Sequence, residues 1–445
     1  MDTPIYNFVK KYQEKGTVRL HMPGHKGSPF LGCEPLDITE IKGADDLYHA
    51  QGIIRQSEDN ATGLFGARKT FYATGGSSQC IGAMVYLAML HGEKGQPILA
   101  GRNAHKAFLH TCALLDLDVR WIYPEEEAPL CNCPILPQQL EGVLASMEVL
   151  PFALYITSPD YLGGIADIRG ISRVCRKFDI PLLVDNAHGA YLRFLPRSLH
   201  PLDLGADMCC DSAHKTLPVL TGGAYLHIGT EAKKSFEHDG ENALALFGST
   251  SPSYLTLQSL DLCNRVLTEG FREKIVDCVK RIDRLAENLQ DMGYSLQHFE
   301  PLKLVIEGGK VGITGYALGE FLRENEIEPE FADADHLVLM FTPNTKEDEF
   351  EKIESALPPI IAKAEAEKRT TLPFRGEQVM SIRNAMFAKR DTVAAEQALG
   401  RICATPAVSC PPAIPIAISG ERITEEMIRL FLLYGIEEIE VVMET

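Results

Sequence analysis

The sequence lacks an apolar run long enough to span a membrane, and residues 1–15 are charged and amphipathic, unlike a secretory signal. It is also poor in basic residues, because 43 Lys and Arg stand against 61 Asp and Glu, which gives a net charge of -18. Phosphate binding needs clustered Lys and Arg, so this balance argues against a nucleic-acid partner and is compatible with a small cationic substrate. We therefore expect a cytoplasmic protein with neither a membrane nor a nucleic-acid partner.

The twelve cysteines include no Cys-x-x-Cys motif, the usual spacing of zinc and redox sites. Cys131 and Cys133 are separated by one residue, and Cys209 and Cys210 are adjacent in an apolar, strand-like run. In a chain of this size such scattered cysteines are typical of reduced thiols that pack as small hydrophobic side chains. We expect neither disulfides nor a metal site.

A chain of 445 residues is long enough for two or three compact units. Short apolar runs alternate with helix-length segments from about residue 70 to 228, which is typical of an α/β domain with a mostly parallel sheet covered on both faces. The expected strands are 70–73, 97–100, 119–123, 153–157, 182–185, 207–210 and 223–228. We predict an N-terminal arm (1–45), a large domain (46–292) and a smaller C-terminal α+β domain (293–445).

The segment Asp-Ser-Ala-His-Lys-Thr at 211–216 lies between two expected strands and carries Ser212, His214 and Lys215. A lysine in such a loop can form an imine with an aldehyde when its amine is neutral, which burial and nearby charges promote. A surface lysine in a turn is the alternative interpretation of this segment.

An acidic residue, Asp185, ends the expected strand 182–185, and His188 follows it closely. A carboxylate at the C-terminal end of a parallel strand faces the crevice in which such sheets bind ligands. Pyridoxal phosphate (PLP) requires an acid there to keep its pyridine nitrogen protonated. Capping of a helix explains Asp185 equally well when the residue is considered alone. His188 could bond near the phenolic oxygen of PLP or cap a turn.

A glycine-serine turn with Gly76, Ser77 and Ser78 follows the first expected strand and opens a helix. The free N–H groups of a helix N-terminus, together with two hydroxyls, suit a phosphate group, although a plain capping turn is the alternative. His105 follows the next expected strand and could stack on an aromatic cofactor or be a structural residue. In order, these segments supply a phosphate cradle, a stacking group, a ring-nitrogen acid and an imine lysine, a combination that favours PLP.

The sequence also resembles the Orn/Lys/Arg decarboxylase family. The resemblance rests on His-Met-Pro-Gly-His-Lys-Gly at 21–27, Arg-Asn-Ala-His-Lys at 102–106, Asp-Asn-Ala-His-Gly at 185–189, Ser-Ala-His-Lys at 212–215 and Pro-Pro-Ala-Ile-Pro at 411–415. It implies fold type I of PLP-dependent enzymes (aspartate-aminotransferase-like), with a smaller C-terminal domain, and decarboxylation of lysine, arginine or ornithine. Another fold-type-I activity, such as that of an aminotransferase, and a non-catalytic homologue remain alternatives.

The resemblance also implies roles for individual residues. Lys215 would form the Schiff base with PLP, Asp185 would pair with the ring nitrogen and His105 would stack on the ring. The phosphate would be bound by Gly76, Ser77, Ser78 and Ser212, and His188 and His214 would contact the cofactor. In a homodimer or larger homo-oligomer, Ser249 and Thr250 would reach the phosphate of the other subunit.

Three positions depart from the family pattern: Gly75 stands where Asn is common, Cys410 where Tyr is usual, and Ala413 where Gly is usual. We expect a short form of the family, without the N-terminal wing domain of its large members. The distal cation of the substrate requires an acidic partner, and the sequence leaves four candidates open: Glu237, Asp239, Glu330 and Asp333.

Overall fold

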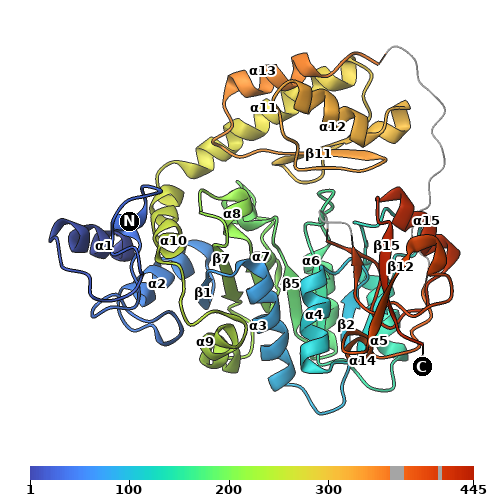
Figure 1. Ribbon diagram of the computed structural model, residues 1–445, viewed down its shortest axis with the longest axis horizontal. Helices are drawn as coiled ribbons and strands as arrows, with labels where there is room; N and C mark the ends of the chain where they lie inside the picture. The colour runs from blue at the N-terminus through green and yellow to red at the C-terminus, as the bar shows by residue number, and fades with distance from the viewer. Residues whose placement is uncertain (361–374, 409–412, 445) are drawn as a thin grey trace. The chain divides into compact units, whose positions relative to one another are not determined.

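The computed structural model describes residues 1–360, 375–408 and 413–444 (Figure 1). The chain forms two compact units that interleave along the sequence. Unit 1 comprises Met1–Gln96, Leu140–Ser158 and Ile168–Glu273, and unit 2 comprises Pro97–Gln139, Pro159–Asp167 and Lys274–Thr445. The division into an arm (1–45) and two domains (46–292 and 293–445) stays a prediction. Cys410, Pro411 and Pro412 lie outside the described residues.

Unit 1 is built around five strands in the order β1-β7-β6-β5-β4. Their bounds are β1 (Lys69–Ala73), β4 (Ala153–Thr157), β5 (Leu182–Asp185), β6 (Met208–Asp211) and β7 (Ala224–Ile228). β4, β5 and β6 run parallel, whereas β7 is antiparallel to β6 and β1. All residues of β5, β6 and β7 are buried, which explains why these strands read as continuous apolar runs rather than alternating ones.

Two helices of unit 1, α3 (Gly76–Leu90) and α9 (Ser235–Phe247), pack against each other and against the sheet (Figure 1). Their close approach requires glycine at position 82, because a Cβ there would lie 2.7 Å from the ring of Phe247. The remaining helical segments of unit 1 are α1 (Pro4–Glu14), η1 (Glu34–Leu36), η2 (Leu47–His49), α2 (Ile53–Phe65), α6 (Ile168–Lys177), η3 (Ala190–Phe194), α7 (Pro201–Leu204), α8 (Ala213–Thr216) and α10 (Tyr254–Thr268).

Unit 2 contains the parallel pair β2 (Ile98–Gly101) and β3 (Val119–Ile122), and an antiparallel sheet in the order β10-β11-β9-β8. The sheet strands are β8 (Leu296–Gln297), β9 (Lys303–Glu307), β10 (Phe331–Ala332) and β11 (His336–Met340). Two further pairs join β12 (Arg390–Ala394) with β15 (Glu438–Val442) and β13 (Ala407–Val408) with β14 (Pro415–Ala417). Its helical segments are α4 (Lys106–Leu115), η4 (Gly308–Val311), α12 (Gly315–Glu324), α13 (Glu347–Ala356), α14 (Ile382–Met386), η5 (Ala395–Gln397) and α15 (Glu425–Leu433).

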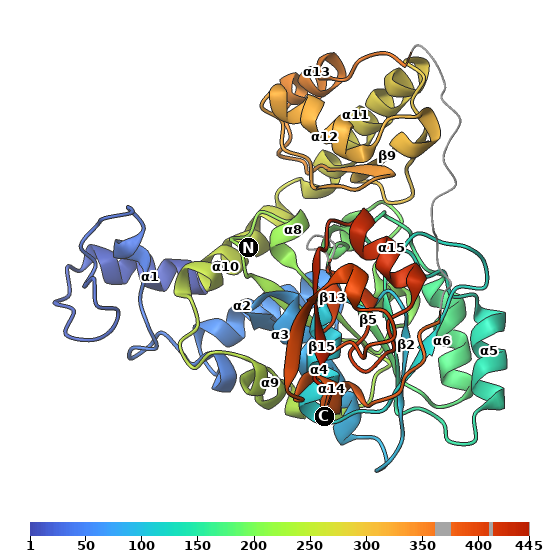
Figure 2. The ribbon, with the colours of Figure 1, turned by 45° about the vertical axis from the view of Figure 1, so that its right-hand side comes forward.

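The core of unit 2 draws on segments that are far apart in the sequence. One buried cluster contains Leu130, Val305 and Phe431 together with Val441, close to the C-terminus. α15 packs against β14. Figure 2 shows the C-terminal segment that carries α15 in red. The apolar face of α15 therefore completes a core that begins three hundred residues earlier in the chain, at Leu130.

The α/β class and the mostly parallel sheet expected from the sequence are confirmed, because each of the seven predicted strands is present. Gly270, which has φ +72°, separates α10 from α11 (Phe271–Asp291). The helix α5 (Pro137–Ser146) directly precedes β4 in the chain. α13 ends at Ala356, and residues 361–374 lie outside the described part. No helix in the described ranges has both the length and the apolarity to cross a membrane.

Candidate active site

The candidate site begins at two neighbouring strand ends in unit 1. β5 ends at Asp185 and β6 at Asp211, and the register pairs Asp185 with Cys210 in parallel orientation. The segments that follow, 186–189 and 212–215, therefore leave the sheet at the same edge, where parallel sheets bind ligands. Both strands are short apolar runs that end in an acidic residue. The polar segments therefore begin at this edge of the sheet.

Asp185 is buried, with 2% exposure, and its carboxylate is surrounded by donors. The hydroxyl of Tyr155, on β4, donates to Oδ2 at 3.0 Å, and the backbone N–H of Ala187 donates to Oδ1 at 3.2 Å. The thiol of Cys210 lies 3.6 Å from Oδ1. The contacts hold the carboxyl group in place at the end of β5, and a carboxylate in this position can pair with a pyridine nitrogen.

Lys215 lies in the single turn of α8, which begins directly after Ser212. Its side chain is half-buried, and its Nζ lies 3.0 Å from Nε2 of His188. The residues that follow β5 and those that follow β6 therefore meet through side chains. The amine does not project freely into solvent, as a lysine in a surface turn would.

A second contact joins the segment before Lys215 to the N-terminus of α3. The hydroxyl of Ser212 donates to the hydroxyl of Ser77 at 2.8 Å. Gly76, the first residue of α3, has φ +70°, and a Cβ at this position would have no neighbour within 4 Å. Its N-cap, Gly75, has no side chain with which to cap the helix, and the N–H of Gly75 itself donates to Oε1 of Gln79 at 3.0 Å. Open space beside an uncapped helix N-terminus and two hydroxyls fits a phosphate group.

The imidazole of His214 has a defined protonation pattern. Its Nδ1 lies 3.1 Å from the carbonyl oxygen of Gly223, so this nitrogen carries the proton. Burial lowers the pKa of His214, and the charge of Lys215 adds to this effect despite the opposing hydrogen bond to Gly223. His214 is therefore neutral at pH 7, with Nε2 unprotonated.

The structure thus brings together Ser77, Ser212, Lys215 and His188, next to the strand that ends at Asp185. Ser78 is exposed at the start of α3. Ser249 and Thr250 are exposed in the segment between α9 and α10, and their predicted contact with a second subunit stays a prediction.

His105 belongs to unit 2, and its stacking role stays a prediction. It is the N-cap of α4, where its Nδ1 accepts from the N–H of Ala107 at 3.1 Å. Next to it, the N–H of Lys106 donates to the carbonyl of Ala413, which adopts φ +60°. Arg102 in the same segment is 2% exposed and donates to the carbonyls of Pro415 and Ile416.

Three of the four acidic candidates for the substrate cation already have partners within the chain. Glu330 accepts from the hydroxyl of Tyr161 at 2.7 Å, and Asp333 pairs with His336 at 3.3 Å. Asp239 pairs with two histidines, His91 and His238, and Glu237 is exposed. These contacts favour none of the four as the substrate partner.

Two features of the site escaped the sequence analysis. Tyr155 looks like a core aromatic residue within the apolar run of β4, and only the strand register places its hydroxyl on Asp185. Asp211 was part of the motif at 211–216 but was given no role, although it is completely buried among polar side chains. A charged residue inside an otherwise apolar strand was the available signal.

Comparison with known proteins gives consistent matches along the chain. The Orn/Lys/Arg decarboxylase major domain matches residues 3–309, and the C-terminal domain of the same family matches residues 373–439. An arginine decarboxylase of Bacillus subtilis (strain 168) is 31% identical over 96% of this chain and 92% of that protein.

Solved structures agree with these matches. The lysine decarboxylase of Francisella novicida superposes with a TM-score of 0.80 at 18% identity, over 99% of this chain and 81% of that chain. A NifS-like protein superposes with a TM-score of 0.56 at 15% identity, over 80% of this chain and 94% of that chain. These likenesses confirm fold type I of PLP-dependent enzymes as the architecture.

Proposed function

The chain belongs to the Orn/Lys/Arg decarboxylase family and is a decarboxylase of a basic amino acid, and from this premise we propose that it acts on arginine with PLP held covalently by Lys215. The observation that carries the proposal is the half-buried amine of Lys215, 3.0 Å from His188, in the segment next to Asp185. The residues present fit the cofactor, because a buried carboxyl group, an accessible amine and an open helix N-terminus occur in one unit.

Each cofactor contact has a proposed residue. Asp185, whose carboxyl oxygens accept from Tyr155 and Ala187, would hold the proton on the ring nitrogen. Ser77, Ser212 and the N-terminus of α3 would bind the phosphate. When bound, PLP supplies an electron sink for the pair left at Cα as CO2 departs.

The remaining chemistry is proton transfer by residues of this chain. We propose that the amine of Lys215 returns a proton to Cα, because this titratable group is itself the proposed point of covalent attachment. His188, at 3.0 Å from this amine, would hold it in position and relay its proton. His214 is neutral and anchored on Gly223, so it would support this segment rather than donate the proton.

Arginine is proposed as the substrate because the relative from Bacillus subtilis, which matches over nearly the whole chain, is named for it. The test offers arginine, lysine and ornithine separately to the PLP-loaded protein, and measures released CO2 and the amine formed. We expect kcat/KM to be highest for arginine, with the decarboxylated guanidino amine as product. A higher value for lysine or ornithine would overturn the substrate, and a keto acid without CO2 would overturn the reaction.

We propose further that the protein is a cytoplasmic homodimer that supplies amines for polyamine biosynthesis. All eleven cysteines in the described part are free, which suits a reducing compartment. The exposed Ser249 and Thr250 would reach the phosphate bound by the partner subunit.

Mixing two inactive variants tests the shared site. One variant carries Lys215→Ala, and the other carries Ser249→Ala with Thr250→Ala. If sites are shared across a dimer, random mixing should restore about a quarter of the wild-type activity, because half of the dimers then have one intact site. A monomer by sedimentation, or no recovery from two variants that are each inactive and dimeric, would contradict the proposal.

A further inference from the structure

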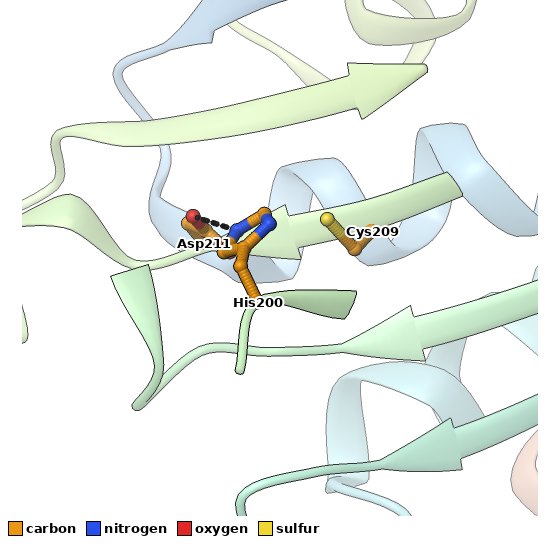
Figure 3. A group of neighbouring side chains, drawn as sticks. All are labelled: His200, Cys209 and Asp211. Carbon is orange, nitrogen blue, oxygen red and sulfur yellow. Dashed lines mark hydrogen bonds and ion pairs between the residues drawn. The ribbon is translucent and has the colours of Figure 1, made fainter. Parts of the chain in front are cut away.

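The last residue of β6, Asp211, is the centre of a completely buried polar network in unit 1. Its Oδ1 accepts from the amide nitrogen of Asn186 at 2.7 Å. Its Oδ2 accepts from Nε2 of His200 at 3.0 Å and from Nε2 of His227 at 3.3 Å. All four side chains have 0% exposure. Figure 3 shows Asp211 and His200 joined across the end of β6.

The hydrogen bonds give this network a defined charge. Burial opposes the ionisation of Asp211, but the attraction and hydrogen bonds of His200 and His227 outweigh it and hold the pKa of this carboxyl well below its usual range. Burial lowers the pKa of His227, whose Nδ1 accepts from the hydroxyl of Thr70 at 2.8 Å. The network is therefore a fixed buried anion with three donors.

The same carboxylate connects the two segments that carry the proposed chemistry. Asn186 directly follows Asp185, and its backbone N–H donates to the carbonyl of Cys210 at 3.0 Å. Ser212 directly follows Asp211 and binds Ser77. Asp211 thus fixes the distance between the segment with the ring-nitrogen acid and the segment that leads to Lys215.

A metal ion is the alternative occupant of this cluster, because potential ligand atoms of His200, Cys209 and Asp211 lie within 4.8 Å of one another (Figure 3). The hydrogen bonds argue against it. Both carboxylate oxygens and Nε2 of each histidine are already paired, which leaves Nδ1 of His200 as the ring nitrogen without a hydrogen-bond partner. Burial raises the pKa of Cys209 well above its usual value, so the thiol stays protonated, whereas a metal ligand must be a thiolate.

We propose that Asp211 is a positioning residue for the decarboxylation, which aligns Asp185 and Lys215 by holding Asn186 on one side and the start of the 212–215 segment on the other. This inference rests on the proposed function, since it assigns a role relative to the residues that would hold PLP. Asp211 itself touches neither cofactor nor substrate in this scheme. Its effect should therefore appear in the chemical step and in the cofactor's protonation, more than in substrate binding.

Asp211→Asn tests the proposal, with Asp207→Asn as the matched control. Asp207 directly precedes β6 and accepts from the backbone N–H of Leu182 at 2.8 Å, at the opposite end of the strand. We expect Asp211→Asn to lower kcat by about 10- to 100-fold with KM changed less than about threefold, and to shift the pH midpoint of the cofactor absorption band. Asp207→Asn should lower Tm alone, and leave kcat and the midpoint unchanged.

A second variant covers the case in which Asp211→Asn does not fold. His227→Phe removes one of the three donors within a cluster of aromatic rings that includes Phe65 and Tyr225. It should shift the midpoint and kcat in the same direction by a smaller amount. Unchanged kcat and midpoint in a folded variant would overturn the positioning role.

Two further outcomes keep this inference distinct from the proposed function. Wild-type protein without turnover and without a cofactor band would overturn the proposed function itself. Stoichiometric zinc in the purified wild-type protein, removed by a chelator together with activity, would overturn the hydrogen-bonded network in favour of a metal site.

Discussion

The hydroxyl groups of Ser77 and Ser212 lie 2.8 Å apart, although 135 positions separate the two residues in the chain. One belongs to the first turn of α3 and the other to the segment that leads to Lys215. This hydrogen bond joins the proposed phosphate site to the proposed attachment site for PLP. A substitution of Ser77 or Ser212 should therefore affect both the phosphate site and the attachment site.

Removal of either hydroxyl should weaken cofactor binding in a non-additive way. Ser77→Ala and Ser212→Ala should each raise the Kd for PLP about tenfold, since each removes a hydrogen bond to a charged group. The double variant should lose less binding free energy for PLP than the sum of the two single losses, because the two hydroxyls interact directly. Titration with PLP checks this, with the exposed Ser146→Ala as control. Strict additivity would mean that the two hydroxyls act independently.

Lys215→Ala should abolish both the covalent attachment and the reaction. We expect the absorption band near the visible edge to vanish and CO2 release to fall by more than about 100-fold, because the amine is both the attachment point and the proton donor. Lys94→Ala, at an exposed position of the same unit, should change neither. A band that survives in Lys215→Ala would place the attachment elsewhere, and a wild-type protein with no bound chromophore would favour a non-catalytic homologue.

Asp185 and Tyr155 should show graded effects on the same step. Asp185→Asn removes the anion and should lower kcat by about 100-fold or more. Tyr155→Phe removes one of the donors to the carboxyl group of Asp185. This should lower kcat about tenfold, which corresponds to about 1.4 kcal/mol. Tyr86→Phe, a partly buried tyrosine on α3, is the control. An effect of Tyr155→Phe as large as that of Asp185→Asn would assign the hydroxyl a more direct role.

The backbone at Ala413 predicts an unusual response to glycine. With φ +60°, Ala413 adopts a left-handed conformation that costs an alanine about 1 kcal/mol in the folded state. Glycine avoids this cost, but its greater freedom in the unfolded chain lowers stability by about 0.4–1 kcal/mol. Ala413→Gly should therefore leave Tm unchanged or raise it. The same substitution in the middle of α11, Ala286→Gly, should cost about 1 kcal/mol. Equal losses in thermal unfolding would show that Ala413 is not strained.

The buried Glu58 predicts a pH dependence of stability. Burial raises its pKa from 4.5 to about 8, against the opposing hydrogen bond from the N–H of Tyr72. Because the folded state binds this proton more tightly than the unfolded state, the stabilisation is full below about pH 4.5 and is lost as the pH rises towards 8. Glu58→Gln stays neutral, so its Tm relative to the wild type should increase over this range. The exposed Glu93→Gln should show a constant difference.

Much of the fold could be predicted because burial on both faces leaves continuous apolar runs, as in β5 and β6. Asp185 and Lys215 were identifiable because each follows such a run directly. In contrast, Tyr155 acquires its role only through strand register, and the partners of Asp211 come from segments 11 to 25 residues away. The pairing of β12 with β15, in which Arg390 lies opposite Val442, also joins distant segments, and local sequence does not reveal such a partner.

The interleaving of the two units has a consequence for how the protein is made. A nascent chain that has emerged to residue 273 can complete unit 1, but the cluster that holds Leu130 must wait for Val441 near the end of synthesis. Until then, apolar side chains of the early segment remain accessible to chaperones and to aggregation. Refolding should be slow for the same reason. A fragment that stops before the last strand should remain an incompletely folded species.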